Sequence, residues 1–265
     1  MFDMKHAILF NFTGSAADLS TIDLTDYLCR PPNGQQWKAI GLKDEPFDPK
    51  LFNFERQERV LPSAVINREA EKRFADYEDH TGRKPGKKAR AEIKSNVIDD
   101  LLPKAFIRVS HIEVTISHGL LIVWTSSIAK ADEVVSLIVG ILTANDFEAQ
   151  IEAKPLKPGL ELVALGKHGA LLPGRSAVLT GPDKQKVRVK ALAVESHRVQ
   201  PLIEVDSYRV NEIEVALGED CCTLTDKGVV KNIELHGSDR DDEAGSWLAT
   251  NFIRRMIDAV DEDEL

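Results

Sequence analysis

The segment LLPKAFIRVS, Leu101 to Ser110, decides how the middle of this chain folds. Pro103 cannot continue a helix, so a helix is expected to end there and a strand to follow. Side chains alternate between the two faces of a strand. One face then carries Ala105, Ile107 and Val109. The other carries Lys104, Phe106 and Arg108. The first face is expected to pack in a core, whereas the second presents an aromatic ring between two cations.

The apolar positions change parity further along this strand. They are odd-numbered up to Val109 and even-numbered from Ile112 to Ile116. Because a strand repeats every two residues, this change predicts a bulge or break near Ser110–His111.

The residues before Pro103 are expected to form a helical hairpin over 63–102. Ser63 is a candidate N-cap, and the apolar residues that follow it have helical spacing up to Tyr77. Gly82, Pro85 and Gly86 interrupt the pattern, and a second helix is expected to begin near Lys87. The two helices are predicted to be antiparallel, with a basic tip.

Strands and helices alternate in mixed order along the rest of the chain, which favours an α+β fold in two lobes. The segment KPLKPG, 154–159, is the expected boundary. The N-terminal lobe is therefore predicted to span 1–153. The C-terminal lobe is predicted to span 154–265, and to end in a helix and an acidic tail.

Several function classes lack their sequence signatures. No apolar run approaches the roughly 20 residues that cross a bilayer, and the N-terminus does not resemble a signal peptide, so a cytoplasmic protein without a membrane partner is expected. No phosphate-binding G-x-x-x-x-G-K-[ST] loop, G-x-S-x-G elbow or H-E-x-x-H motif occurs. The three cysteines lack metal-ligand spacing and are expected to be small buried residues. We expect no cofactor and no catalytic residue.

Charge is segregated along the chain, although the net charge is −9. Between Arg83 and Arg108, eight basic residues accompany three acidic ones, a local charge of +5. From Glu234 to Leu265 the local charge is −7. A phosphate backbone senses the field within about 10 Å at moderate salt, so a local basic patch predicts DNA contact despite the acidic total. The alternative is a solvated helix tip without a partner.

An acidic cluster near the C-terminus permits another interpretation. Its members are Asp239, Asp241, Asp242 and Glu243. Carboxylates of this kind hold divalent ions in nucleases. They also stabilise a helix N-terminus without any metal, which is the interpretation that we favour.

The block from Glu58 to Leu142 resembles the bacterial RdgC family of recombination-associated DNA-binding proteins. The resemblance rests on ERVLPSAVI, LLPKAFIRVS, HGLLIVWTSS and AKADEVVSLI, in this order. The later runs EIEVAL, CCTLTDKGVVKNIEL and DRDDEAGSWLATNFI fit the family's ending more loosely. The chain is shorter than the usual member between Lys154 and Lys190.

The resemblance implies a horseshoe-like subunit that closes, as a head-to-head homodimer, into a ring around duplex DNA. Members of the family bind double-stranded DNA with little sequence preference and restrain the RecA recombinase by occupying DNA that it needs. They are not known as enzymes. A location on the nucleoid follows from this expectation.

The resemblance also implies roles for particular residues. Phe106 matches an aromatic residue at one of the two subunit contacts, and Arg188 and Lys190 fall near the second. Packing of Phe106 in the core of its own chain is the alternative. The expected DNA-binding residues are Arg83, Lys84, Lys87, Lys88, Arg90, Lys94, Lys104 and Arg108.

Two other functions compete with this one. The first is a metal-dependent nuclease that acts on recombination DNA through the acidic cluster. The second is a protein that contacts a recombinase directly and needs no DNA.

Overall fold

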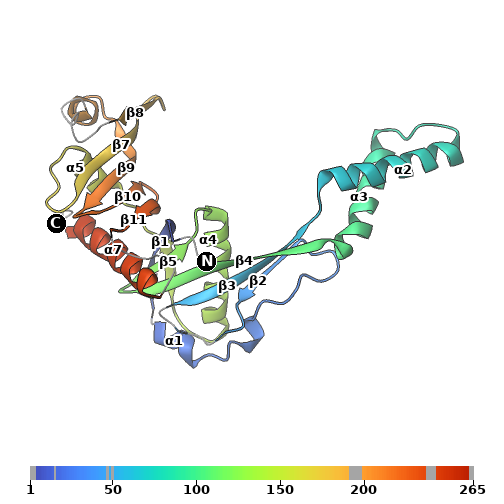
Figure 1. Cartoon of the computed structure of the whole chain (residues 1–265), viewed down its shortest axis with the longest axis horizontal. Coiled ribbons are helices and arrows are strands. Elements are labelled where there is room, and N and C mark those ends of the chain that lie inside the picture. The colour runs from blue at the N-terminus through green and yellow to red at the C-terminus, as the bar shows by residue number, and fades with distance from the viewer. Residues whose placement is uncertain are drawn as a thin grey trace. The chain divides into compact units, whose positions relative to one another are not determined.

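The computed structural model describes residues 4–14, 16–45, 48, 51–190, 199–236 and 243–262 (Figure 1). Helices and mostly antiparallel strands occur in mixed order, which confirms the α+β prediction. Close contacts divide the chain into two compact units. Unit 1 comprises Met1–Asp23, Pro46–Asn53 and Ile112–Leu265. Unit 2 comprises Leu24–Glu45 and Phe54–His111.

This division differs from the boundary expected near residue 154. The first strand, β1 (His6–Thr13), pairs antiparallel with β11 (Val229–Glu234), with Ala7 opposite Val230. Strands from both ends of the sequence therefore belong to one sheet in unit 1. Unit 2 is instead an insertion built around the helical hairpin. A linear pattern of prolines cannot reveal this, because sheet pairing joins segments that are far apart in the sequence.

The helical hairpin forms as predicted. Helix α2 spans Ser63–Thr81 and α3 spans Lys87–Leu101, and the short 3-10 helix η2 (Leu102–Lys104) follows at the proline. The facing sides of α2 and α3 enclose Ala70, Phe74 and Val97. Ser63 is not the N-cap: Pro62 occupies that position, and no side chain caps the helix.

The rest of unit 2 supports the hairpin with strands. It contains the 3-10 helix η1 (Thr25–Tyr27) and β2 (Lys38–Leu42), which pairs antiparallel with β3 (Phe52–Val60). Gly41 lies against the backbone of Cys29, where an added Cβ would come within 2.5 Å of the Cys29 nitrogen. Only glycine allows this close approach, since backbone atoms cannot move aside as a flexible side chain can.

Strand β4 (Phe106–Ser117) runs from unit 2 into unit 1 without a break. Its first residues are exposed on both faces: Phe106 is 88% exposed, Ile107 38% and Val109 49%. Residues 112–116 are buried on both faces. The prediction that Ile107 and Val109 pack in a core is therefore wrong for the single chain. The strand also continues through Ser110–His111 without the break that was one of the two expected irregularities, a bulge or a break. The parity change marks the point where the strand enters the core.

The sheet of unit 1 continues from β4 through strands that are far apart in sequence. The neighbours follow the order β4, β5, β1, β11, β10, β9, β7 and β8, and β6 pairs with β1. The bounds are β5 Leu120–Trp124, β6 Gln150–Ala153, β7 Leu172–Thr180, β8 Lys186–Lys190, β9 Arg209–Leu217 and β10 Asp220–Thr225.

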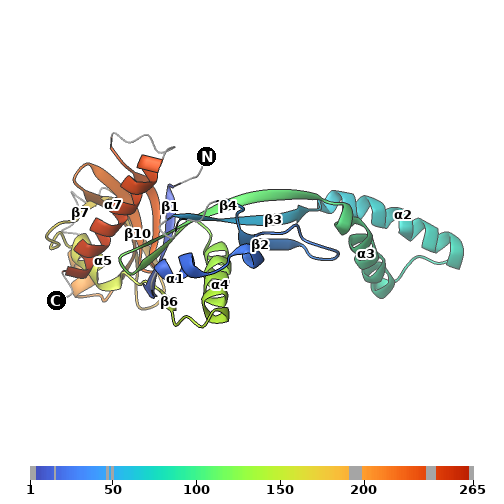
Figure 2. The same cartoon turned by 90° about the horizontal axis from the view of Figure 1, so that it is seen from below.

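Helices cover this sheet. They are α1 (Ala16–Thr21), α4 (Ile128–Ala144), α5 (Lys157–Ala164) and α7 (Glu243–Glu262). One core joins α5 and α7 to alternate residues of the strands, such as Leu9 and Ile122. The buried residues of α4 lie outside that core, and Figure 2 shows α4 and α7 on different sides of β1. No helix in the described ranges combines the length and apolar character required to cross a bilayer.

Candidate nucleic-acid interface

The tip of the hairpin joins α2 to α3 through a tightly held loop. Gly82 ends α2 with φ 69°, and its N–H donates to the Glu78 carbonyl at 2.7 Å. A positive φ suits glycine, because it has no Cβ to clash. Pro85, within the loop, is buried, and α3 begins two residues later. The loop therefore holds the cations on either side of it in defined positions.

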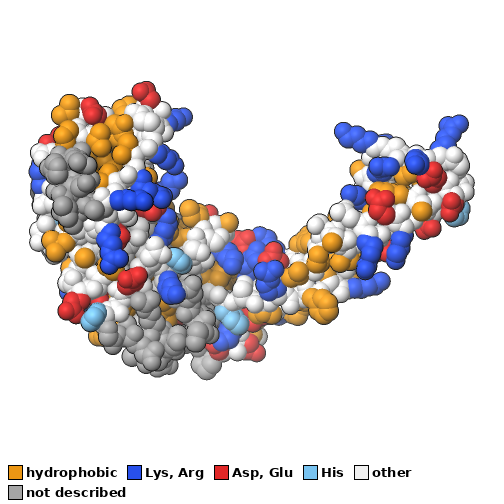
Figure 3. Space-filling view, turned by 45° about the horizontal axis from the view of Figure 1, so that its top comes forward, with side chains coloured by type: hydrophobic (Ala, Val, Ile, Leu, Met, Phe, Trp, Pro, Cys, Tyr) orange, Lys and Arg blue, Asp and Glu red, His pale blue; other side chains and the backbone are white. Residues whose placement is uncertain are grey.

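The cations of this tip are exposed and have no carboxylate partner. Arg83, Lys84, Lys87 and Lys88 are all exposed, and none forms an ion pair with a residue that the structure describes. Figure 3 shows Lys and Arg side chains at the end of the hairpin. Their charge is therefore available to an anion from outside the chain.

Arg90 and Lys94 also contribute to the hairpin itself. Arg90 Nε donates to the Pro85 carbonyl at 3.1 Å, and its guanidinium lies 5.4 Å from the centre of the Phe74 ring. Lys94 Nζ donates to Asn67 Oδ1 at 3.1 Å, which connects the two helices. Substitution of either residue would therefore disturb the hairpin as well as its charge.

The first turn of α3 contains cations where a helix prefers anions. No acidic residue lies in that turn, whereas Lys87, Lys88 and Arg90 do. The N-terminal end of a helix carries a partial positive charge, so each cation there costs about 0.3–1 kcal/mol when exposed. The same arrangement concentrates positive potential next to free backbone N–H groups, which favours phosphate binding.

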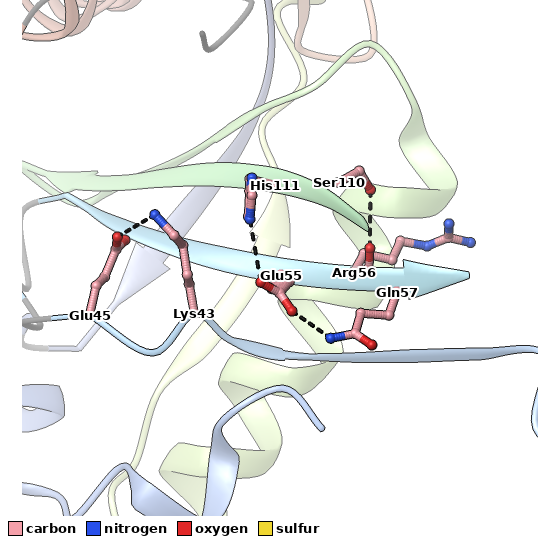
Figure 4. Close-up of polar contacts among 7 residues, drawn as sticks. All are labelled: Lys43, Glu45, Glu55, Arg56, Gln57, Ser110 and His111. Carbon is pink, nitrogen blue, oxygen red and sulfur yellow. Dashed lines mark hydrogen bonds and ion pairs between the residues drawn. The ribbon is translucent and has the colours of Figure 1, made fainter. Parts of the chain in front are cut away.

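Cations at the other end of unit 2 differ because they are paired. Lys43 Nζ lies 2.5 Å from Glu45 and Arg56 lies 2.8 Å from Glu58. Glu55 accepts a hydrogen bond from Gln57 at 2.6 Å and lies 3.4 Å from His111 (Figure 4). The charges of Lys43 and Arg56 are thus neutralised within the chain, in contrast to those of the hairpin tip.

Residues of the LLPKAFIRVS segment lie at the start of β4. Lys104 belongs to η2 and not to the strand, and its side chain is exposed, as is that of Arg108. Phe106, between them, is the most exposed large apolar side chain described. The alternative that Phe106 packs in the core of its own chain is therefore wrong.

Arg59 holds this segment in place. It is only 9% exposed, and its guanidinium donates to the carbonyl oxygens of Leu102, Pro103 and Pro32 at 2.9, 2.9 and 2.6 Å. No sequence motif singles out Arg59. An arginine in a strand otherwise pairs with acidic neighbours, and nothing in the sequence indicates that it binds distant carbonyl groups.

The second predicted contact lies on β8, at an edge of the unit 1 sheet. Lys186, Arg188 and Lys190 alternate with Val187 and Val189, so the three cations share the exposed face of the strand. None of them has a carboxylate partner among the residues described. Arg188 and Lys190 are thus accessible to another molecule.

The cysteine side chains are reduced and poorly ionised. Burial raises the pKa of the Cys222 thiol far above its usual range, and neighbouring Cys221 adds to the effect. Burial followed by Glu55 raises the pKa of Cys29, and burial followed by Glu234 raises that of Cys221. Thiolates are the reactive form, so these environments disfavour nucleophilic or redox chemistry. Cys222 is buried as expected, whereas the other two are half-buried.

The acidic cluster falls largely outside the described residues. Asp239, Asp241 and Asp242 lie in the gap before α7, which begins at Glu243. Within the described ranges, no group of three or more His, Cys, Asp or Glu residues could hold a metal ion.

A family model described as "Putative exonuclease, RdgC" matches residues 47–251. Relatives that bear the name recombination-associated protein RdgC include one from Bordetella pertussis (strain Tohama I), 41% identical over 92 residues. Another, from Xanthomonas campestris pv. campestris (strain B100), is 39% identical over 88 residues.

A longer alignment, with the protein of this name from Cupriavidus pinatubonensis (strain JMP 134), covers 142 residues at 31% identity. It accounts for 53% of this chain and 44% of the relative. The two shorter alignments account for 34% and 32% of this chain, and for 30% and 29% of the relatives. The chain thus covers less than half of each relative. Since the family model matches well over half of the sequence, the chain belongs to the RdgC family of recombination-associated proteins.

Proposed function

We propose that this protein binds double-stranded DNA without sequence preference, encircles it as a dimeric ring and restrains RecA-dependent recombination. In this proposal the DNA-binding surface consists of basic residues of the hairpin and of the segment after it: Arg83, Lys84, Lys87, Lys88, Arg90, Lys94, Lys104 and Arg108. Two copies meet through Phe106 at one contact and through Arg188 and Lys190 at the other. The protein needs no cofactor and acts on the nucleoid by occupying DNA.

The unpaired cations of the hairpin tip carry this proposal. Surface cations elsewhere in unit 2, such as Lys43 and Arg73, have carboxylate partners at 2.5 and 2.8 Å. Those of the tip have none among the described residues, and Lys87 and Lys88 also oppose the dipole of their own helix. A DNA phosphate compensates both effects, since it supplies the missing negative charge.

The type of side chain supports binding without sequence preference. Lysine and arginine on an exposed tip contact phosphates, which position a protein on DNA but carry no sequence information. Each neutralised phosphate contributes about 0.9 to the dependence of log affinity on log salt concentration.

The exposed start of β4 supports self-association. Phe106, Ile107 and Val109 place apolar surface in solvent on both faces of the strand. Aromatic residues that become buried at a contact are typical interface anchors, each contributing about 2–4 kcal/mol. Because the anchor is not needed by the core of its own chain, a second copy is a suitable partner.

The decisive experiment neutralises three cations of the tip. The variant Lys84→Gln, Lys87→Gln, Lys88→Gln is compared with the wild type in binding to a 30-base-pair duplex over a range of salt concentrations. We expect weaker binding and a salt slope reduced by about 2.7, because three phosphate contacts are lost.

A matched control removes the same charge from paired positions. Lys72, Lys167 and Lys231 lie 3.3, 2.5 and 2.7 Å from Glu69, Glu204 and Glu212, respectively. Changing these three to glutamine alters the net charge equally and should leave the slope close to that of the wild type. Equal slopes in both variants would contradict the assignment of DNA binding to the tip.

A nuclease is the second candidate, because the matching family model carries the word exonuclease. Incubation with linear and nicked duplexes in Mg²⁺ or Mn²⁺ separates the two functions. Degradation that is lost in an Asp241→Asn, Asp242→Asn variant would replace our proposal. If a recombinase is instead captured from nuclease-treated lysate by the triple tip variant, direct protein contact would replace it.

A further inference from the structure

A pocket of about 430 Å³ lies in unit 1, between α7 and the ends of β10 and β11. This volume is within the range of about 300–1,000 Å³ that is typical of small-molecule sites. Apolar and polar side chains line it from both sides. They are Asp220, Leu235, His236, Trp247, Leu248, Asn251, Phe252, Arg254 and Arg255. The pocket involves none of the residues assigned above to DNA or to self-association.

Helix α7 presents an aromatic ring, an amide and a cation in a row. Trp247, Asn251 and Arg255 are spaced four residues apart, so they share one face of the helix. Each step of four residues is about 6 Å along the axis. Long side chains lean toward the helix N-terminus, which brings the Arg255 guanidinium toward Asn251.

The ring of Trp247 is available for stacking. It is 66% exposed, in contrast to Trp124, which is buried and donates to Thr115 Oγ1 at 3.0 Å. An exposed tryptophan in the wall of a pocket offers a flat apolar surface to another aromatic ring.

Two guanidinium groups give the pocket its charge. Neither Arg254 nor Arg255 has a carboxylate partner in the part of the chain that the structure describes. Arg254 Nη1 lies 3.4 Å from His118 Nε2, and Arg254 Nε is buried without a hydrogen bond to any described residue. Unpaired guanidinium groups bind phosphate well, because their N–H groups match its oxygens.

The opposite wall offers a hydrogen-bond acceptor. Asp220 Oδ1 accepts a hydrogen bond from the backbone N–H of His236 at 2.8 Å, which fixes the position of this carboxylate at the start of β10. Oδ2 has no partner among the described residues and can accept an N–H from the edge of a base. His236 itself lies 3.7 Å from Glu219.

We propose that this pocket binds a single nucleotide, either free or at the end of a DNA strand. The base stacks on Trp247, the Asp220 carboxylate accepts from its edge, and the phosphate is bound by Arg254 and Arg255. An apolar protein segment fits the pocket less well, because it would bury the two guanidinium groups without an anionic partner.

The test titrates the full chain with three probes in a calorimeter: deoxyadenosine monophosphate, deoxyadenosine and inorganic phosphate. We expect the monophosphate to bind most tightly. Trp247→Ala should weaken its binding about tenfold, since base–aromatic stacking is lost. The matched control is Trp37→Ala, which removes a tryptophan that is 45% exposed in unit 2 and should bind as the wild type does.

Arg255→Gln separates the phosphate from the base. It should weaken the monophosphate about tenfold and leave deoxyadenosine unchanged, because only the charge-assisted bond to phosphate is lost. No binding at millimolar monophosphate, or wild-type binding in both pocket variants, would overturn the proposal. So would self-association that depends on Trp247 and is insensitive to nucleotide, since the surface would then be a protein interface.

This inference does not rest on duplex binding by the hairpin tip. The Lys84→Gln, Lys87→Gln, Lys88→Gln variant should bind the monophosphate as the wild type does. Conversely, Trp247→Ala should retain the salt slope of the wild type on a closed circular duplex, which has no strand ends. Each proposal can therefore fail while the other stands.

Discussion

The guanidinium of Arg59 donates to the carbonyl oxygen of Leu102 at 2.9 Å, and this buried bond fastens β3 to the end of the helical hairpin. Hydrogen bonds from Arg59 on β3 thus fix the turn at Leu102–Lys104, which lies immediately before Ala105 and Phe106. The position of the proposed contact residue Phe106 thus depends on an arginine that is almost entirely buried.

Arg59→Met should destabilise unit 2. Methionine fills much of the space but leaves buried carbonyl oxygens without a donor, and a hydrogen bond to a charged group contributes about 1.5–3 kcal/mol. We expect the free energy of unfolding in urea to fall by at least this amount. Arg83→Met, at the exposed tip, should change it by less than about 0.5 kcal/mol. Equal effects of the two substitutions would mean that Arg59 has no special structural role.

Lys87→Glu should change stability and DNA binding in opposite directions. An acidic side chain in the first turn of α3 interacts favourably with the helix dipole, so the free energy of unfolding should rise by about 0.3–1 kcal/mol. Duplex affinity should fall, because a phosphate contact becomes a repulsion. Thermal unfolding and fluorescence anisotropy measure the two effects.

Lys94→Glu is the comparison for Lys87→Glu, because it makes the same charge change on α3 beyond the first turn. It should weaken DNA binding and lower stability, because it gains nothing from the helix dipole and loses the hydrogen bond to Asn67. A loss of stability in Lys87→Glu would show that the dipole argument does not hold at this helix.

Phe106→Ser should weaken self-association without unfolding the chain. Since the ring is 88% exposed in the single chain, its removal should change the free energy of unfolding of the monomer by less than about 0.5 kcal/mol. The free energy of dimer formation should become less favourable by about 2–4 kcal/mol. Sedimentation velocity over a range of concentrations measures this change.

Trp37→Ser provides the comparison for Phe106→Ser, because it also removes an exposed aromatic side chain from unit 2. It should leave the dimer intact. A dimer of unchanged affinity in Phe106→Ser would exclude Phe106 from the contact.

Alkaline pH should destabilise the protein partly through Cys222. In the unfolded chain the thiol ionises near pH 9.0, whereas burial keeps it protonated in the folded state. Above that pH the folded state binds more protons than the unfolded state, so the free energy of unfolding falls as the pH rises. The contribution of one thiol approaches about 1.4 kcal/mol per pH unit.

Cys222→Ala removes this contribution, so its stability should fall less steeply than that of the wild type between pH 9 and 11. Urea unfolding at several pH values measures both slopes, and lysine and tyrosine residues affect the two proteins equally. Identical slopes would show that Cys222 ionises in the folded state.

Local patterns in the sequence were sufficient where neighbours in the chain decide the structure. Gly82, Pro85 and Pro103 delimit α2 and α3, because backbone dihedral preferences act within a few residues. The cluster of cations at the hairpin tip follows directly from these boundaries, so its residues could be named before the structure was known.

Sequence patterns gave wrong predictions of burial and of domain division where these depend on segments far apart in the chain. The alternation of Ile107 and Val109 indicated a buried face, but no segment that the structure describes covers it, and both residues are exposed. The division near residue 154 failed to anticipate that β1 pairs with β11. Arg59 gave no signal, because its acceptors at Pro32 and Leu102 lie 27 and 43 residues away.

The sequence by itself determined the α+β class, the helical hairpin and the location of its basic tip, since these follow from local backbone preferences and local charge. The tertiary structure alone decided which charges are paired, which apolar residues are covered and how Trp247 and Arg255 come to face Asp220 across a pocket. Pairing and burial depend on contacts between segments far apart in the chain, and a linear pattern does not record those contacts.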